Sequence, residues 1–263
     1  MSNERASQQA FLGVAALLFV ASAAVTVVWC ASMSAMGEMP MAGGWTMSMV
    51  WTRMPGQTWP GAVASFVTMW VAMMVAMMLP SLVPMLWRYR QAVERTAGMR
   101  LGWLTALVGT GYFLVWTVFG VAVFPLGVAL SEIVMRQPAL SHGVPIAVGV
   151  VVLLVGVLQF TTWKANRIAC CREVPRHCRT FSADAGTAWR YGLRLGLDCG
   201  QCCASLMAIL LVMGVMDLRV MAIVTAAITA ERLAPAGLNV ARAIGTVVVG
   251  VGLFDLARAA GFG

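Results

Sequence analysis

Three cysteines and a methionine fall within the nine residues CGQCCASLM: Cys199, Cys202, Cys203 and Met207. At spacings of three and four residues on a helix, the thiols can share one face, with the thioether one turn further on. The helix is expected to begin near Leu193 or at Asp198, because Asp198 and Gln201 resemble a helix N-cap and its partner. Thiols at the positive end of a helix dipole favour the thiolate, which is the form that binds metal. Metal binding, a redox pair and packing of small apolar residues all stay open.

A second sulfur-rich stretch, MSAMGEMPMAGGWTMSM at residues 33–49, contains six methionines: Met33, Met36, Met39, Met41, Met47 and Met49. Glu38, Pro40 and two glycines interrupt it, which predicts an irregular loop outside the membrane. Exposed methionines have no packing reason to cluster in a loop, and thioethers are soft ligands that select Cu(I) over harder divalent ions. The alternative is a loop on the bilayer surface, in which methionine is a flexible apolar filler.

A third stretch, MWVAMMVAMMLPSLVPM at residues 69–85, places Met73 and Met77 on one helical stripe and Met78 on the adjacent one. Taken alone, such a stripe is more typical of core packing, because methionine packs well in apolar helices. We expect this stripe and the cysteines to fall in the same half of their spans. If the two helices are neighbours, two thiolates and a thioether could form a sulfur site with few ligands.

The composition indicates an integral membrane protein, because 60% of the residues are hydrophobic and only 11% are charged. Six apolar runs are candidate spans: residues 11–31, 62–79, 101–130, 144–163, 193–216 and 238–256. A shorter run at 220–235 is a seventh candidate. We therefore predict an all-α, polytopic transmembrane helix bundle of six to seven spans, with seven favoured, that forms a single domain over residues 1–263.

The net charge of +8 is distributed unevenly. Arginines concentrate at residues 88–100 and 164–194, together with Lys164, whereas residues 31–61 and 131–143 contain one arginine each. This is the positive-inside pattern, and it argues against nucleic acid as a partner. It predicts a bacterial inner-membrane protein with a cytoplasmic N-terminus, cytoplasmic loops at 88–100 and 164–194, and an outer loop at 31–61. Most cysteines then face a reducing compartment, where structural disulfides are rare.

Two smaller features carry ionisable or metal-binding side chains. The basic loop contains Cys170, Cys171, His177 and Cys178. Their spacing matches no standard zinc module, so a weak metal site and inert surface thiols fit equally well. Glu231 lies near membrane depth and is a candidate functional group. Arg232 follows it, and a simple pair between these two neighbours would explain both.

Several motifs together resemble a family of predicted metal-binding integral membrane proteins, some of which are called copper chaperones. They are AMMLPSLVP (76–84), CGQCCASLM (199–207), GVMDLRVMAI (214–223) and ER (231–232). The resemblance extends over roughly residues 62–255 and implies metal binding within a membrane. This chain departs from the family pattern in two places. Arg232 stands where the family usually has lysine, and CCREVPRHC stands where the family tends to have a spaced cysteine pair.

We therefore predict a membrane protein that binds Cu(I) through cysteine and methionine, and either transports it or delivers it to a copper-handling protein or membrane complex. No P-loop is present, so any transport would be passive, ion-coupled or partner-driven. We expect no catalytic residues and no organic cofactor. Two alternatives remain: a membrane thiol–disulfide oxidoreductase that uses Cys199 and Cys202, and an assembly subunit whose sulfur residues only pack.

Overall fold

The computed structural model describes residues 2–35, 37, 39–41, 44–53, 56–172 and 184–261. These residues form eight α-helices, a two-stranded hairpin and two short 3-10 turns. The helices are α1 (Ser2–Ala35), α2 (Trp59–Ala97), α3 (Leu101–Arg136), α4 (Pro138–Leu158), α5 (Thr162–Arg172), α6 (Ala185–Met213), α7 (Leu218–Leu233) and α8 (Gly237–Ala259). The strands are β1 (Met39–Pro40) and β2 (Thr46–Met47), and the 3-10 turns are η1 (Met49–Trp51) and η2 (Gly98–Arg100). The predicted all-α class is confirmed.

Six of the described helices are long and apolar enough to cross a membrane: α1, α2, α3, α4, α6 and α8. The seventh candidate, α7, has 16 residues. At 1.5 Å per residue it is about 24 Å long, which is less than the ~30 Å of a hydrocarbon core. One face of α7 packs against α2, α6 and α8, and Ile223 on the other face is exposed. A full seventh span therefore stays a prediction.

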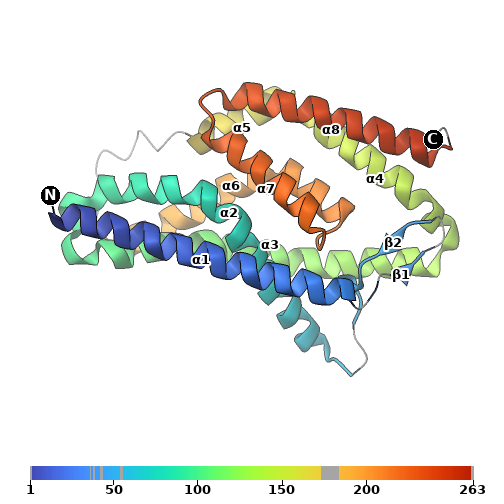
Figure 1. The fold of residues 1–263 in the computed structure, drawn as a ribbon, viewed down its shortest axis with the longest axis horizontal. Helices are drawn as coiled ribbons and strands as arrows, with labels where there is room; N and C mark the ends of the chain where they lie inside the picture. Colours follow the sequence, from blue (N-terminus) through green and yellow to red (C-terminus); the bar gives the residue numbers. More distant parts are fainter. Residues whose placement is uncertain are drawn as a thin grey trace.

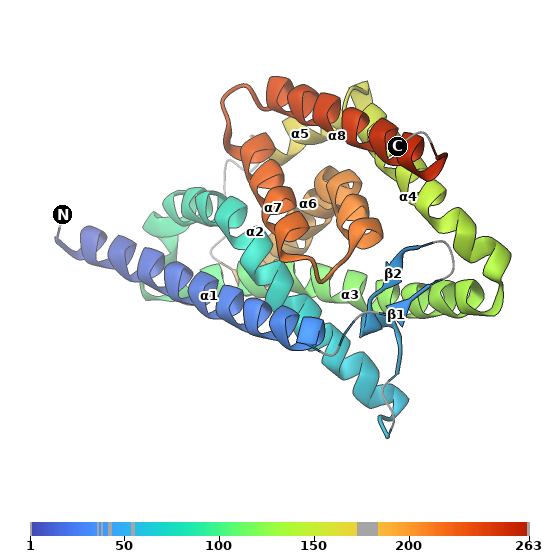
Figure 2. The same ribbon diagram turned by 45° about the vertical axis from the view of Figure 1, so that its right-hand side comes forward.

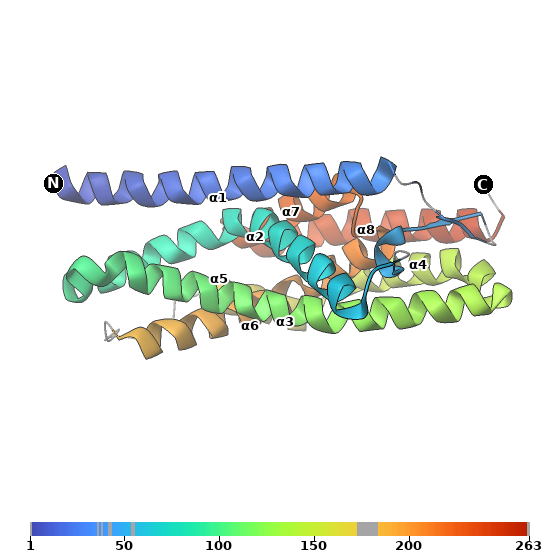
Figure 3. The ribbon, with the colours of Figure 1, turned by 90° about the horizontal axis from the view of Figure 1, so that it is seen from below.

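The helices lie roughly along one direction, and the two termini are at opposite ends of the molecule (Figure 3). The α2–α3 junction lies at the end that holds the N-terminus, and the hairpin and the α3–α4 junction lie at the other (Figure 1). More than half of the spanning part of α2 and of α6 is buried, against 11–28% for the other four long helices. These two helices therefore supply most of the interior, and α7 lies beside both (Figure 2).

Two prolines mark the bend in α2. Pro80 and Pro84 lie inside this 39-residue helix, and Figure 3 shows its two halves at an angle. A proline inside a helix removes a backbone hydrogen bond and crowds the preceding turn, so the helix bends there. Ser81 lies between the two prolines, fully buried, and its hydroxyl donates to the carbonyl of Met78 at 3.0 Å. The bend thus brings a polar side chain to the centre of the bundle.

Glycines bring α3 and α6 into close contact. A Cβ atom at Gly192 would lie 2.3 Å from the carbonyl oxygen of Val108, and one at Gly196 would lie 2.9 Å from that of Tyr112. Any larger residue at these two positions would push the helix backbones apart. Small residues are a common means of close helix packing in membranes. The contact continues one turn further along α6, where Cys199 faces Tyr112.

The helix that carries the cysteines begins earlier than either expected start, Leu193 or Asp198. Helix α6 begins at Ala185, and its N-cap is Asp184, whose carboxylate accepts from the backbone N–H of Thr187 at 3.2 Å. No proline interrupts residues 185–197, and the packing of their glycines and apolar residues on α3 keeps them helical. Asp198 therefore lies within the helix, and Cys199 lies about halfway along its 29 residues. The thiols are far from the positive end of the helix dipole, whose effect is confined to the first turn.

Candidate metal centre

Two thiols of α6 form the core of the centre. The Sγ atoms of Cys199 and Cys203 are 3.7 Å apart, and both side chains are at most 2% exposed. Cys202 is equally buried, and the thiol of Cys203 interacts with those of both other cysteines. Metal–thiolate bonds of about 2.3 Å at a tetrahedral angle separate two sulfurs by about 3.8 Å. One ion could therefore bridge Cys199 and Cys203 with little movement of either side chain.

Two donors from other helices point at Cys199. The hydroxyl of Tyr112 on α3 donates to its Sγ at 2.9 Å, and the guanidinium of Arg232 on α7 donates at 3.0 Å. A hydrogen bond from a cation to an anionic acceptor is about twice as strong as one between neutral groups. These contacts would stabilise a negatively charged sulfur at this buried position. We expected the positive end of the helix dipole to favour the thiolate, and these two donors take that role instead.

Arg232 also connects the cysteines to the bend in α2. Its guanidinium donates to the hydroxyl of Ser81 at 2.9 Å and lies 3.9 Å from the Sδ of Met85. Arg232 on α7 therefore contacts a sulfur atom on each of the two buried helices, Met85 Sδ on α2 and Cys199 Sγ on α6. This link runs through Met85, which the sequence did not single out as a ligand.

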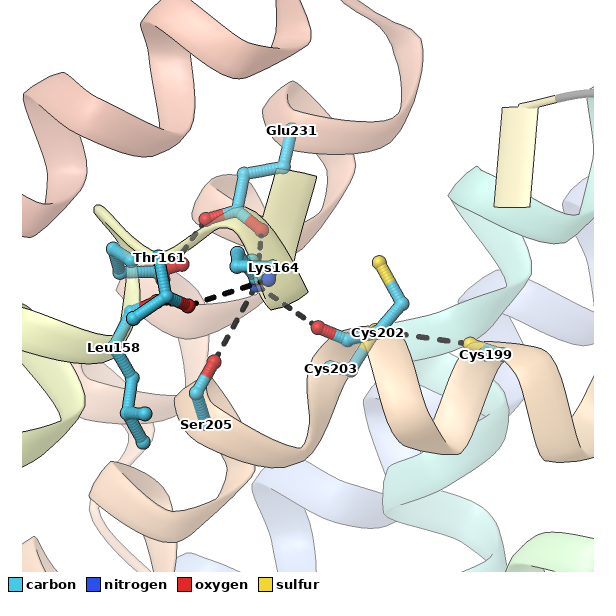
Figure 4. A network of polar contacts seen from close by, with 9 residues as sticks. Leu158, Thr161, Lys164, Cys199, Cys202, Cys203, Ser205 and Glu231 are labelled. Atoms are coloured by element: carbon cyan, nitrogen blue, oxygen red, sulfur yellow. Dashed lines mark hydrogen bonds and ion pairs between the residues drawn. The ribbon is translucent and has the colours of Figure 1, made fainter. Parts of the chain in front are cut away.

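A second buried charge cluster lies beside the thiols (Figure 4). Lys164 Nζ is 2.8 Å from a carboxylate oxygen of Glu231, and it also donates to the carbonyl of Cys202 at 2.9 Å and to Ser205 Oγ at 3.4 Å. The side-chain amide of Gln159 donates to the other carboxylate oxygen at 3.0 Å. This network holds the break between α4 and α5 against α6 and α7.

The network corrects two predictions. Lys164 was placed in the basic loop at 164–194, but it belongs to α5 and is fully buried. A pair between Glu231 and Arg232 was the alternative to a functional role for Glu231, but Glu231 pairs with Lys164, while Arg232 points to Cys199. Neighbouring residues on a helix project about 100° apart, so the two side chains reach different partners. The composition already set Lys164 apart from the other basic residues, because it is the only lysine among 18 lysines and arginines.

The α2 methionines lie in the same hydrophobic core as the cysteines. Met73, Met77 and Met78 are at most 1% exposed, and Met207 on α6 is also buried. Another α2 methionine, Met85, is linked to the cysteines, because the guanidinium of Arg232 contacts both Met85 Sδ and Cys199 Sγ. The stripe therefore belongs to the same buried core as the thiols, and its role as a route for metal remains a prediction.

The methionine-rich segment at residues 33–49 contains regular structure where it is described: the end of α1, the hairpin and the start of η1. Met39 and Met47 are cross-strand partners in the β1–β2 hairpin, and Met47 is buried. The other described methionines of the segment are half-buried: Met33, Met41 and Met49. The indole of Trp45 donates to the carbonyl of Ser141, which fastens the hairpin to α4. Met36, His177 and Cys178 lie outside the described residues, as do the side chains of Cys170 and Cys171.

Within the part of the chain that the structure describes, no three side chains of His, Cys, Asp or Glu are grouped so as to hold a metal ion. The candidate centre therefore rests on the thiol pair, with thioethers and hydrogen-bond donors around it. A second sulfur pair lies nearer the hairpin end, where Cys30 Sγ is 3.9 Å from Met216 Sδ.

Fold and site together define an all-helical bundle with six helices long and apolar enough to cross a membrane and a buried cluster of thiols. The chain belongs to a family described as copper chaperones, which matches residues 67–254. The match includes the α2 methionines, the three clustered cysteines, Glu231 and Arg232, and it begins after the methionine-rich segment at residues 33–49. No curated protein and no solved structure matches the chain.

Proposed function

We propose that this protein binds Cu(I) inside a membrane through the thiolates of Cys199 and Cys203, with Cys202 and Met207 as further sulfur ligands on the same helix. The observation that carries this proposal is the 3.7 Å separation of the two Sγ atoms, with a guanidinium 3.0 Å from one of them. The family description as copper chaperones supports the choice of copper. Thiolate and thioether sulfur favour Cu(I) over Cu(II).

The remaining sulfur atoms suggest how the ion reaches this centre. The methionines of residues 33–49 would collect or release Cu(I) outside the membrane: Met33, Met36, Met39, Met41, Met47 and Met49. The buried stripe of Met73, Met77 and Met78 would offer weaker thioether ligands along the way. Thioether contacts are individually weak, so an ion could pass between them and settle at the thiolates. From there the protein would transport the ion or deliver it to a copper-handling partner.

The orientation in the membrane follows from the arginine distribution. In the bacterial inner membrane, the N-terminus and the α2–α3 junction would lie in the cytoplasm. The hairpin and the C-terminus would then lie outside. Arg53 and Arg100 are exposed and lie near opposite ends of α2, so a cysteine at either position can report its side of the membrane. Each is introduced singly into a variant in which serine replaces Cys170, Cys171 and Cys178. A membrane-impermeant thiol reagent should label position 53 on intact cells and position 100 only after lysis. The reverse pattern would refute this orientation.

Elemental analysis of the purified protein tests the function itself. Wild-type protein loaded with Cu(I) under reducing conditions should retain about one ion per chain, and Cys199→Ser with Cys203→Ser should lose most of it. Serine is nearly isosteric with cysteine and can hydrogen-bond to the helix backbone, so the fold should persist. Cys30→Ser is the matched control, because it replaces another buried thiol that lies outside the cluster. Full copper loading in the double variant would exclude this site.

The same samples separate copper binding from thiol–disulfide exchange. An oxidoreductase would show alkylation of Cys199 and Cys202 that depends on prior reduction, without bound copper. An assembly subunit would show neither copper nor a redox-dependent change. Either result for the wild-type protein would reject the proposal.

A further inference from the structure

We infer that one exposed face of α6 is the surface on which the copper-handling partner docks, and that this partner is negatively charged around its own metal ligands. The inference rests on the proposed function, because it takes the thiol centre as the site from which Cu(I) leaves. It goes further by assigning the surface at which the ion is transferred and the charge of the partner that receives it.

A stripe of polar side chains follows the outer side of α6 from its first turn to the level of the thiols. Its members are exposed and recur every three or four residues, so they share one side of the helix: Thr187, Arg190, Arg194, Asp198 and Gln201. Most of the stripe lies toward the end of the bundle that holds the N-terminus (Figure 3). Charged side chains that face hydrocarbon are strongly unfavourable, so this side of α6 contacts water or another polar surface.

The stripe passes within one helical turn of a buried thiol. Asp198 and Cys202 are four residues apart on α6, so their side chains are neighbours on the helix surface. Asp198 is exposed, whereas Cys202 is 1% exposed and its thiol interacts with that of Cys203. Four residues of helix correspond to a rise of about 6 Å. Exposed polar surface therefore lies about one turn from the cluster.

Helix α5 borders the stripe on the side of Cys202. Lys164 on α5 donates to the carbonyl of Cys202, and Arg167, one turn further along α5, interacts electrostatically with Asp198. Arg194 on α6 interacts with the same carboxylate. The two helices thus meet along a seam that contacts Cys202 at its buried side and carries these charges at its exposed side. We define the docking face as Arg167 together with the α6 stripe.

The docking face is positively charged near the thiols. Arg167, Arg190 and Arg194 outnumber its single carboxylate, Asp198. The other acidic residue nearby, Asp184, caps the start of α6, about 22 Å along the helix from Cys199. Surfaces of opposite charge attract each other and guide the encounter, so this face fits a negatively charged partner. A site that receives Cu(I) through thiolates carries negative charge itself.

The transfer is a ligand exchange without electron transfer. The bonds from Cu(I) to Cys199 and Cys203 break as bonds to the ligands of the partner form, and copper stays Cu(I) throughout. The released thiolates take up protons from water. The proposed role of the docking face is to hold the partner beside the seam while this exchange takes place.

The test measures how fast two chelators of different charge remove Cu(I) from loaded protein in detergent. A disulfonated phenanthroline is anionic, and its unsulfonated parent binds Cu(I) through the same two nitrogens without charge. At low ionic strength, Arg190→Gln with Arg194→Gln should lower the second-order rate constant for the anionic chelator at least about threefold and leave that for the neutral chelator unchanged. The difference should disappear at about 1 M salt, where screening acts beyond about 3 Å.

Arg53→Gln with Arg219→Gln is the matched control, because it removes two exposed arginines that belong to neither α5 nor α6. Equal slowing in this control would assign the effect to overall charge, and equal slowing for both chelators would assign it to an altered fold. Either result overturns the inference. Stabilisation by phosphatidylglycerol that only the Arg190 and Arg194 variant loses, with unchanged transfer rates, would assign the face to lipid headgroups and overturn it as well.

Copper per chain is measured in every sample before transfer begins. Wild-type protein that holds no copper would reject the proposed function, and this inference with it. Normal loading followed by transfer that does not depend on chelator charge would reject the docking face alone and leave the thiol centre intact.

Discussion

Tyr112 on α3 and Cys199 on α6 meet in the middle of the bundle, where the phenol hydroxyl donates a 2.9 Å hydrogen bond to the thiol sulfur. Both side chains are fully buried. The contact depends on the glycines of α6, because a side chain at Gly196 would collide with the backbone of Tyr112. Close packing of two apolar helices thus brings a polar donor to the candidate metal ligand.

Replacing Tyr112 with phenylalanine should weaken Cu(I) binding without unfolding the protein. The aromatic ring still fills its place, and only the donor to Cys199 is lost. A hydrogen bond to a charged group contributes about 1.5–3 kcal/mol, so we expect at least about tenfold weaker Cu(I) binding. Chelator competition measures the affinity, and a thermal unfolding curve checks the fold. Unchanged affinity would mean that this hydroxyl does not stabilise the bound form.

Gly192→Ala should destabilise the protein through the α3–α6 contact. The added Cβ would lie 2.3 Å from the carbonyl oxygen of Val108, so the two helices must separate. Overpacking of this kind costs about 1–3 kcal/mol. Gly109→Ala is the matched control on α3, because a Cβ there meets nothing within 4 Å. Thermal unfolding in detergent should show a lower midpoint for the first variant alone. Equal midpoints would contradict the close approach of these helices.

The buried pair of Lys164 and Glu231 should behave as a unit. Glu231→Gln leaves the ammonium without its counter-charge, and loss of one partner of a buried pair costs about 3–5 kcal/mol. Lys164→Met leaves the carboxylate uncompensated and should be similarly harmful. The combined Lys164→Met and Glu231→Gln variant should be more stable than either single variant, which a double-mutant cycle of unfolding free energies measures. Additive losses would show that the two charges do not compensate each other.

Met77→Leu should affect copper loading much less than loss of the cysteines. Leucine preserves most of the packing volume in the core, and a thioether is a weaker ligand than a thiolate. The bound copper per chain should stay close to the wild-type value, whereas uptake into vesicles should slow if the stripe forms part of the route. An unchanged uptake rate after replacement of Met73, Met77 and Met78 together would assign the stripe to packing alone.

Composition and periodicity were sufficient to predict the helical class and most of the spans. Long apolar runs leave few alternatives to helices, because every backbone polar group must be satisfied within the segment. The same local information indicated the clustered thiols, since Cys199, Cys202 and Cys203 lie within two turns of one helix. It placed the helix start incorrectly, because Asp198 resembles an N-cap in sequence and only packing on α3 shows that the helix has already begun at Ala185.

The chemical surroundings of the thiols were decided by tertiary structure alone. Cys199 accepts from Tyr112, which lies 87 positions away along the chain, and from Arg232, which lies 33 positions away. The neighbouring carbonyl of Cys202 accepts from Lys164, which lies 38 positions away. No local pattern states which of two adjacent residues, Glu231 or Arg232, will face the sulfur. That choice depends on how α7 is rotated between α2 and α6. The sequence alone therefore determined that sulfur side chains cluster on one apolar helix, and the packing of four helices determined which polar and charged groups surround them.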